Sequence, residues 1–143
     1  MRRLFIAAIF VVTGAGMALA QGDVVNQRQT ILKSFGAGVR DPGAMLRGEA
    51  PFDIAKVKAA LATIKTGAPQ LGALFPDASL AGTSKALPLI AQERAQFAAI
   101  FTKLAADATA AEAAITSEAT FKTEFPKVLA NCGACHRPYR QPQ

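Results

Sequence analysis

The sequence has few histidines and cysteines, and it lacks the patterns that bind nucleic acids. It has no tryptophan, one histidine and two cysteines among 143 residues. A structural zinc site takes four protein ligands, and the cysteines and the histidine supply only three. The net charge is +6, but no run of five or more basic residues occurs and no aromatics are interleaved with the basic residues. Nucleic-acid binding is therefore not expected.

The first twenty residues have the pattern of a signal peptide. Arg2 and Arg3 precede the apolar stretch 4–12, and positions 18–20 read Ala-Leu-Ala, a small-x-small cleavage pattern. We expect cleavage after Ala20, a mature domain over 21–143 and a periplasmic location. An uncleaved anchor is disfavoured because the uncharged stretch 4–20 is short and contains two glycines. No later stretch is apolar enough to span a bilayer, so no membrane association is expected after cleavage.

Apolar residues recur at helical spacing, and strand-forming residues do not alternate with period two. The spacing predicts helices over about 24–48, 54–67, 88–115 and 120–139, with Asp53 as the N-cap of the second. The Asp-Pro-Gly sequence at 41–43 is expected to kink or break the first helix. A loop over 67–87 is expected to contain one helical turn near 71–75. These segments predict one all-α domain, an antiparallel up-down-up-down four-helix bundle.

Both cysteines and the single histidine fall within five residues. Cys132, Cys135 and His136 have the C-x-x-C-H spacing of c-type haem attachment, in which two thiols bind the vinyl groups of a haem and the histidine ligates its iron. A thioredoxin-like redox pair requires a βαβ setting, which the helical pattern contradicts. An export-compartment disulfide leaves His136 unexplained. Covalent haem is the favoured interpretation.

A charged residue interrupts the apolar stripe of the first helix. Arg28 lies at helical spacing from Val25, Leu32 and Phe35, where a charge is rarely buried without a partner. A haem propionate is one anionic partner for its guanidinium. The alternative is that Arg28 extends from the helix edge into solvent.

Three segments resemble the class II c-type cytochromes, specifically the cytochrome c′ family. They are residues 28–32, 48–53 and 132–140, so the resemblance covers the whole mature chain. It implies that Cys132 and Cys135 are thioether anchors of one haem c and that His136 is the proximal iron ligand. It also implies that Arg28 and Gln29 lie beside the haem propionates.

The same resemblance places Arg140 close to the proximal histidine and Leu32 on the distal side of the iron, where family members carry a methionine ligand or a non-ligating residue.

The implied function is electron transfer, binding of small gases such as nitric oxide and carbon monoxide, or both, without enzymatic activity. A six-coordinate, low-spin electron carrier is the alternative. A haem peroxidase is disfavoured because no second histidine is present, and a haem-free helical module would lack Soret absorption. Haem is the expected bound partner, and the sequence does not identify a redox partner protein. The resemblance also implies a possible homodimer, because family members often dimerise through their first two helices.

Overall fold

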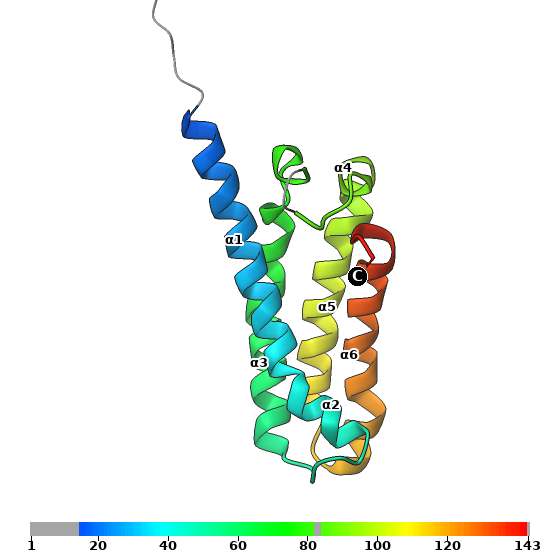
Figure 1. Cartoon of the computed structure of the whole chain (residues 1–143). Coiled ribbons are helices and arrows are strands. Elements are labelled where there is room, and N and C mark those ends of the chain that lie inside the picture. Colours follow the sequence, from blue (N-terminus) through cyan, green and yellow to red (C-terminus); the bar gives the residue numbers. More distant parts are fainter. Residues whose placement is uncertain (1–14, 82–83, 143) are drawn as a thin grey trace, which may run out of the picture.

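Four long helical segments form an antiparallel bundle (Figure 1). A computed structural model describes residues 15–81 and 84–142, with side chains from Asp23 onward. The segments are, in chain order, α1 (Ala15–Gly38) with α2 (Arg40–Leu46), α3 (Ile54–Leu71), α4 (Leu89–Gln92) with α5 (Arg94–Ala114), and α6 (Glu118–Tyr139). They run down, up, down and up in Figure 1, so α6 ends at the end of the bundle where α1 begins. The predicted all-α four-helix bundle is confirmed.

The predicted signal peptide is only partly within the described residues. Residues 1–14 lie outside them, and residues 15–20 form the first turns of α1. Cleavage after Ala20 stays a prediction. No helix within 15–81 and 84–142 combines the length and the apolarity that a bilayer crossing requires.

The first segment is interrupted at Val39, and the prediction of a break over 41–43 was wrong by a few residues. The Val39 amide donates to the Phe35 carbonyl at 3.0 Å, and the Val39 carbonyl accepts from the Gly43 amide at 2.9 Å. Pro42 is buried in the first turn of α2. The first-turn amides of a helix have no intrahelical acceptor, so a proline there costs the helix no hydrogen bond. The Asp-Pro-Gly sequence therefore begins a helix.

The start of α3 was predicted correctly. Asp53 is its N-cap, and its carboxylate accepts from the Ala55 amide at 2.9 Å and the Lys56 amide at 3.2 Å. These bonds satisfy two of the amide donors that the first turn of a helix leaves unpaired.

The predicted end of α3 near Gly67 was wrong, because the helix continues to Leu71. Gly67 is buried in the contact with α1, and a Cβ atom there would lie 2.7 Å from Cε1 of Phe35 and 3.0 Å from Cγ2 of Ile31. Its lack of a side chain allows α1 and α3 to approach closely. Gly67 is therefore a packing residue, and it does not terminate the helix.

The predicted third helix is divided in two. Glu93, with φ −114° and ψ 41°, separates the short α4 from α5. Arg94 begins α5, donates to the Phe75 carbonyl at 2.5 Å and pairs with Asp77. The 67–87 region holds two 3₁₀ turns, Gly72–Leu74 and Asp77–Ser79, and the first corresponds to the predicted helical turn.

The last helix, α6, ends at Tyr139 as predicted and begins at Glu118, two residues before the predicted start. Ser117 and Thr120 form a capping box at its N-terminus. Pro126 and Pro138 both lie inside the helix. The core between the helices is rich in phenylalanine and alanine, and its largest fully buried side chains include Phe97, Phe121, Phe125, Leu61, Leu71, Ile90 and Ile115.

Candidate functional site

The Cys-x-x-Cys-His motif occupies the last two turns of α6. Cys132 and Cys135 are half-buried free thiols, and His136 is exposed. At 3.6 residues per turn, Cys132 and His136 share one face of the helix, and Cys135 lies about 100° round from His136. Cys135 packs against the hydrophobic core. The motif therefore presents two thiols on adjoining faces with an accessible imidazole beside them.

The surroundings keep all three side chains uncharged near neutral pH. Burial raises the pKa of the Cys135 thiol to about 11, with a further contribution from Cys132, and burial also raises the pKa of Cys132. Partial desolvation lowers the pKa of His136, and the nearby charge of Arg140 lowers it further. A neutral imidazole has a free nitrogen lone pair, which is the form that ligates a metal.

The residues predicted for the distal side lie on α1. Leu32 keeps 36% of its surface exposed, which is unusual among the large apolar side chains that the structure describes, and Gln29 is also exposed. The α1 helix packs along α3 and α6 packs along α5, whereas α1 and α6 make no comparable contact within the described residues. Leu32 and His136 therefore lie on two helices that do not pack together.

Arg28 is buried, with only 3% of its surface exposed, so the interpretation that it extends into solvent was wrong. One terminal guanidinium nitrogen donates to the Leu74 carbonyl at 2.9 Å and to Oγ of Ser79 at 2.6 Å. The other donates to the Ser79 carbonyl at 2.8 Å and to Oγ of Ser84 at 2.6 Å. Arg28 thus connects α1 to Leu74, Ser79 and Ser84.

All four of these acceptors are neutral. Burial lowers the pKa of Arg28, but an arginine stays protonated at any physiological pH, so its positive charge is buried without an acidic partner among these contacts. The four bonds use both terminal nitrogens. The propionate contact predicted for Arg28 stays a prediction. Ser79 and Ser84 were not identified from the sequence, where nothing distinguishes them from other loop serines.

Arg140 caps the C-terminal end of α6 and is half-buried. It forms an isolated antiparallel bridge with Ala86. The Leu87 amide donates to the Tyr139 carbonyl, and the Gln141 amide donates to the Lys85 carbonyl, both at 2.9 Å. The end of α6 is therefore fixed to the segment that leads into α4. Sequence periodicity gives no signal for such a contact.

Tyr139 adds a side-chain bond at the same place. Its hydroxyl donates to a carboxylate oxygen of Glu93 at 2.7 Å, and this bond is the main cause that raises the pKa of Tyr139 to about 12. The ring packs edge-on against Phe97, with the centroids 5.1 Å apart. The break between α4 and α5 thus places Glu93 within reach of the haem-motif helix.

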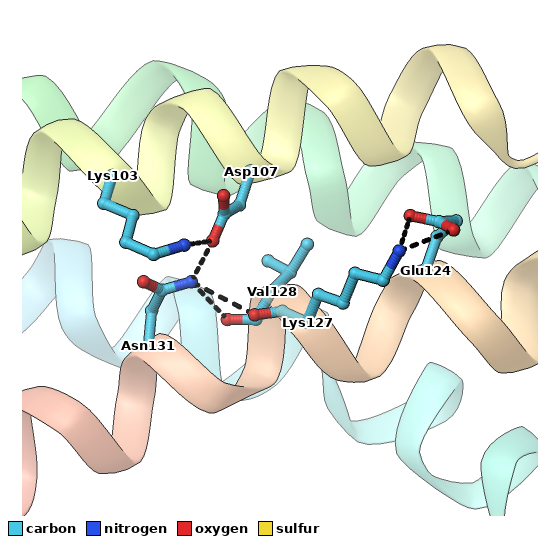
Figure 2. A network of polar contacts seen from close by, with 6 residues as sticks. All are labelled: Lys103, Asp107, Glu124, Lys127, Val128 and Asn131. Atoms are coloured by element: carbon cyan, nitrogen blue, oxygen red, sulfur yellow. Dashed lines mark hydrogen bonds and ion pairs between the residues drawn. The ribbon is translucent and has the colours of Figure 1, made fainter.

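One residue before the motif, Asn131 makes a second polar contact with α5 (Figure 2). It is 5% exposed, and its Nδ2 donates to Asp107 at 2.7 Å and to the Lys127 and Val128 carbonyls at 3.2 Å. Asp107 also pairs with Lys103 at 2.5 Å. The bonds to Lys103 and then Asn131 lower the pKa of the Asp107 carboxyl.

This donor set fits a covalently bound haem better than a bare metal ion. Within residues 15–81 and 84–142, no group of three or more His, Cys, Asp or Glu side chains could hold such an ion. Two free thiols one helical turn apart suit the two vinyl groups of a haem, and a neutral imidazole can ligate its iron. The exposed apolar side chain of Leu32 offers a surface that a macrocycle can cover.

Comparison with known proteins identifies the family. A family model described as Cytochrome C′ matches residues 23–140. The chain belongs to the cytochrome c′ family. As a family member it is a c-type cytochrome whose cofactor is covalently bound haem c with its iron. The resemblance and the cofactor predicted from the sequence are confirmed, whereas the roles of individual residues stay predictions.

Relatives match nearly the whole chain. Cytochrome c′ of Rhodopseudomonas palustris is 45% identical over 139 residues, which are 96% of this chain and 95% of the relative. Its solved structure gives a TM-score of 0.82 at 44% identity and covers 85% of this chain and 98% of that chain. Cytochrome c-556 of Agrobacterium fabrum is 38% identical, covering 94% of this chain and 91% of the relative.

A more distant cytochrome c′ family member has been solved with a bound gas. It is a leucine-to-isoleucine variant of cytochrome c′ from Alcaligenes xylosoxidans in a nitric oxide complex. It is 25% identical to this chain, with a TM-score of 0.73, and covers 85% of this chain and 97% of that chain.

Proposed function

We propose that this chain is a periplasmic haem protein acting in electron transfer, in the binding of small gases such as nitric oxide and carbon monoxide, or in both. Cys132 and Cys135 hold the haem, His136 ligates its iron, and Leu32 covers the opposite side. One observation carries the proposal. An exposed histidine beside two free thiols on α6 and an exposed leucine on α1 lie on helices that do not pack together.

Haem supplies an iron centre that exchanges single electrons and binds a diatomic gas where a coordination position is open. The chain supplies the attachment and the orientation. Two thiols on adjoining faces of α6 hold the macrocycle in one orientation, and the lowered pKa of His136 keeps its imidazole neutral at pH 7. Arg28 and Gln29 are assigned to the propionate edge, and Arg140 is assigned to the side of His136.

The distal side has no suitable protein ligand in this proposal. Leucine has no donor atom, and His136 is the only histidine in the sequence. Met45 is buried on α2 and lies thirteen residues beyond Leu32, which corresponds to roughly 20 Å along a helix at 1.5 Å per residue. The interruption at Val39 changes the direction of the chain but leaves Met45 in the core. We therefore infer a five-coordinate iron.

An apolar distal side also favours particular gases. Leu32 offers no hydrogen-bond donor to a polar iron–dioxygen unit, which favours nitric oxide and carbon monoxide over oxygen. The nitric oxide complex of the Alcaligenes xylosoxidans relative supports the assignment of this ligand class.

The periplasmic location depends on the predicted signal peptide over residues 1–20. Export from a bacterial host should produce a mature domain that starts at Gln21, and N-terminal sequencing of the secreted protein measures this directly. A purified protein that retains Met1 would contradict the location.

The absorption spectrum of the ferrous protein tests the open iron position. We expect a high-spin spectrum at neutral pH that changes on addition of carbon monoxide, and low-spin bands in the Leu32→Met variant. Low-spin bands in the unmodified protein would indicate the six-coordinate electron carrier instead. A Leu32→Met variant that keeps the high-spin spectrum would show that residue 32 does not lie over the iron.

A further inference from the structure

The buried face of α6 carries two polar side chains, one on each side of Cys135. Asn131, Cys135 and Tyr139 are spaced by four residues, so they lie along one face of the helix. Asn131 is 5% exposed, Tyr139 is 6% exposed, and Cys135 packs against the core. Cys132 and His136 each follow a member of this row by one residue, so they lie on the adjoining face, about 100° round the helix.

Both polar side chains on this face donate to carboxylates at α5. Nδ2 of Asn131 donates to Asp107 at 2.7 Å, and the hydroxyl of Tyr139 donates to Glu93, the N-cap residue of α5, at 2.7 Å. Figure 2 shows the first of these contacts between the two helices. The two bonds tie α6 to α5 just before Cys132 and three residues after His136.

These bonds are more selective for the rotation of α6 than the apolar contacts beside them. The apolar contacts beside them, such as the Tyr139 ring against Phe97, have no donor and acceptor to align, so they tolerate a modest rotation of the helix. A hydrogen bond weakens steeply when its geometry is lost, and a buried donor without an acceptor is costly. Rotation of α6 about its axis would break both bonds together. The observed rotation of the helix is therefore favoured over slightly different rotations.

We propose that Asn131 and Tyr139, through Asp107 and Glu93, are positioning residues that set the rotation of α6 and thereby the direction in which Cys132 and His136 face. The inference rests on the proposed function, because the direction of His136 matters only if it ligates the haem iron. None of the four residues touches the iron in this proposal. They act through the orientation of the helix that carries its ligand.

The test removes each bond with little change of shape. Tyr139→Phe deletes only the hydroxyl and keeps the ring against Phe97, and Asn131→Leu replaces the amide by an apolar group of similar size. Thr123→Val is the matched control, because its hydroxyl bonds the Ala119 carbonyl on the exposed face of the same helix.

The measurements are made on holoprotein and report the iron site itself. We expect Tyr139→Phe and Asn131→Leu to keep covalent haem but to shift the reduction potential and broaden the ferric electron paramagnetic resonance signal. The shift should be larger in the double variant than in either single variant. Thr123→Val should match the unmodified protein in both properties.

A pair of variants at the Asn131 contact distinguishes loss of the bond from general damage. Asp107→Asn keeps an acceptor for Asn131, so the potential and the linewidth should stay near those of the unmodified protein. Asn131→Asp places two carboxylates together and should disturb both.

The outcomes separate this inference from the function on which it rests. If the mass of the unmodified protein does not include a haem, both the positioning role and the proposed function are wrong. Haem-loaded Tyr139→Phe and Asn131→Leu variants that match Thr123→Val in potential and linewidth overturn the positioning role alone. The same holds if Asn131→Asp leaves the potential and the linewidth unchanged while its haem remains attached.

Discussion

The guanidinium carbon of Arg28 lies 4.5 Å from the centroid of the Phe75 ring. The Phe75 ring in turn packs edge-on against Phe97, with the centroids 4.8 Å apart, and Phe97 packs against Tyr139. A continuous series of side-chain contacts therefore connects α1, which carries Leu32, with α6, which carries His136. The buried charge of Arg28 is stabilised by the Phe75 ring and by the neutral acceptors on Leu74, Ser79 and Ser84.

Arg28→Lys should destabilise the protein. A lysine keeps the charge but cannot donate in the planar fork that reaches Leu74, Ser79 and Ser84 together. Each hydrogen bond to a charged group contributes about 1.5–3 kcal/mol, so we expect the free energy of unfolding to fall by at least about 2 kcal/mol. Urea denaturation measures it. Arg47→Lys, at an exposed arginine paired with Glu49, is the control and should change stability little.

The same residue allows a test of the predicted propionate contact. A Ser79→Ala/Ser84→Ala double variant weakens the hold on the loop but leaves Arg28 in place. If Arg28 also serves a propionate, Arg28→Lys should shift the reduction potential and the serine double variant should not. Equal shifts, or no shift in Arg28→Lys, would contradict the propionate contact.

Gly67→Ala should destabilise the contact between α1 and α3. The added Cβ atom would lie 2.7 Å from the Phe35 ring, and overpacking of this kind costs about 1–3 kcal/mol. Gly36→Ala is a matched control, since a Cβ atom there meets nothing within 4 Å and should stabilise α1 by up to about 1 kcal/mol. Thermal unfolding of both variants measures the difference. The packing role of Gly67 is wrong if both substitutions raise the melting temperature.

Asp107 should contribute stability that is lost in acid. Its bonds to Lys103 and Asn131 lower the pKa of its carboxyl in the folded protein below the value of about 4 expected for the unfolded chain. The contribution is therefore fully present above pH 4 and declines as the pH falls through the folded-state pKa. The urea midpoint of Asp107→Asn should depend less on pH below 4 than that of the unmodified protein. Identical acid dependence would contradict this assignment.

Covalent attachment can be measured directly. Acid-acetone extraction should leave the haem on the polypeptide, because thioether bonds resist it. Cys132→Ala/Cys135→Ala should release the haem to the organic phase, and either single variant should retain it through one bond. Colour that extracts from the unmodified protein would show that the attachment is not covalent.

Sequence reasoning was most reliable where one segment determines the outcome. The cap at Asp53 and the end of α6 at Tyr139 depend on local chemistry and spacing, and both are found where they were predicted. The haem motif lies on the last helix as predicted, and the roles of its three residues stay predictions. The four-helix bundle followed from periodicity, because each apolar stripe must be buried against a neighbour.

The features that sequence reasoning missed depend on contacts between distant segments. Glycine is common at helix ends, which is why Gly67 was predicted to end its helix, but its burial against Phe35 makes it a packing residue. The acceptors of Arg28 at Ser79 and Ser84 are 51 and 56 residues away, and serines carry no signal of such a pairing. Glu93, at which α4 and α5 divide, accepts a bond from Tyr139, 46 residues away, and no local pattern encodes that contact.

Tyr139 also makes the protein a single-site optical reporter. It is the only tyrosine, and the chain has no tryptophan, so all intrinsic emission above that of phenylalanine originates three residues from His136. A haem attached to the same helix would quench that emission by energy transfer, and movement of α6 away from it would restore the signal. Tyrosine fluorescence of this chain therefore reports the C-terminal end of α6 and no other part.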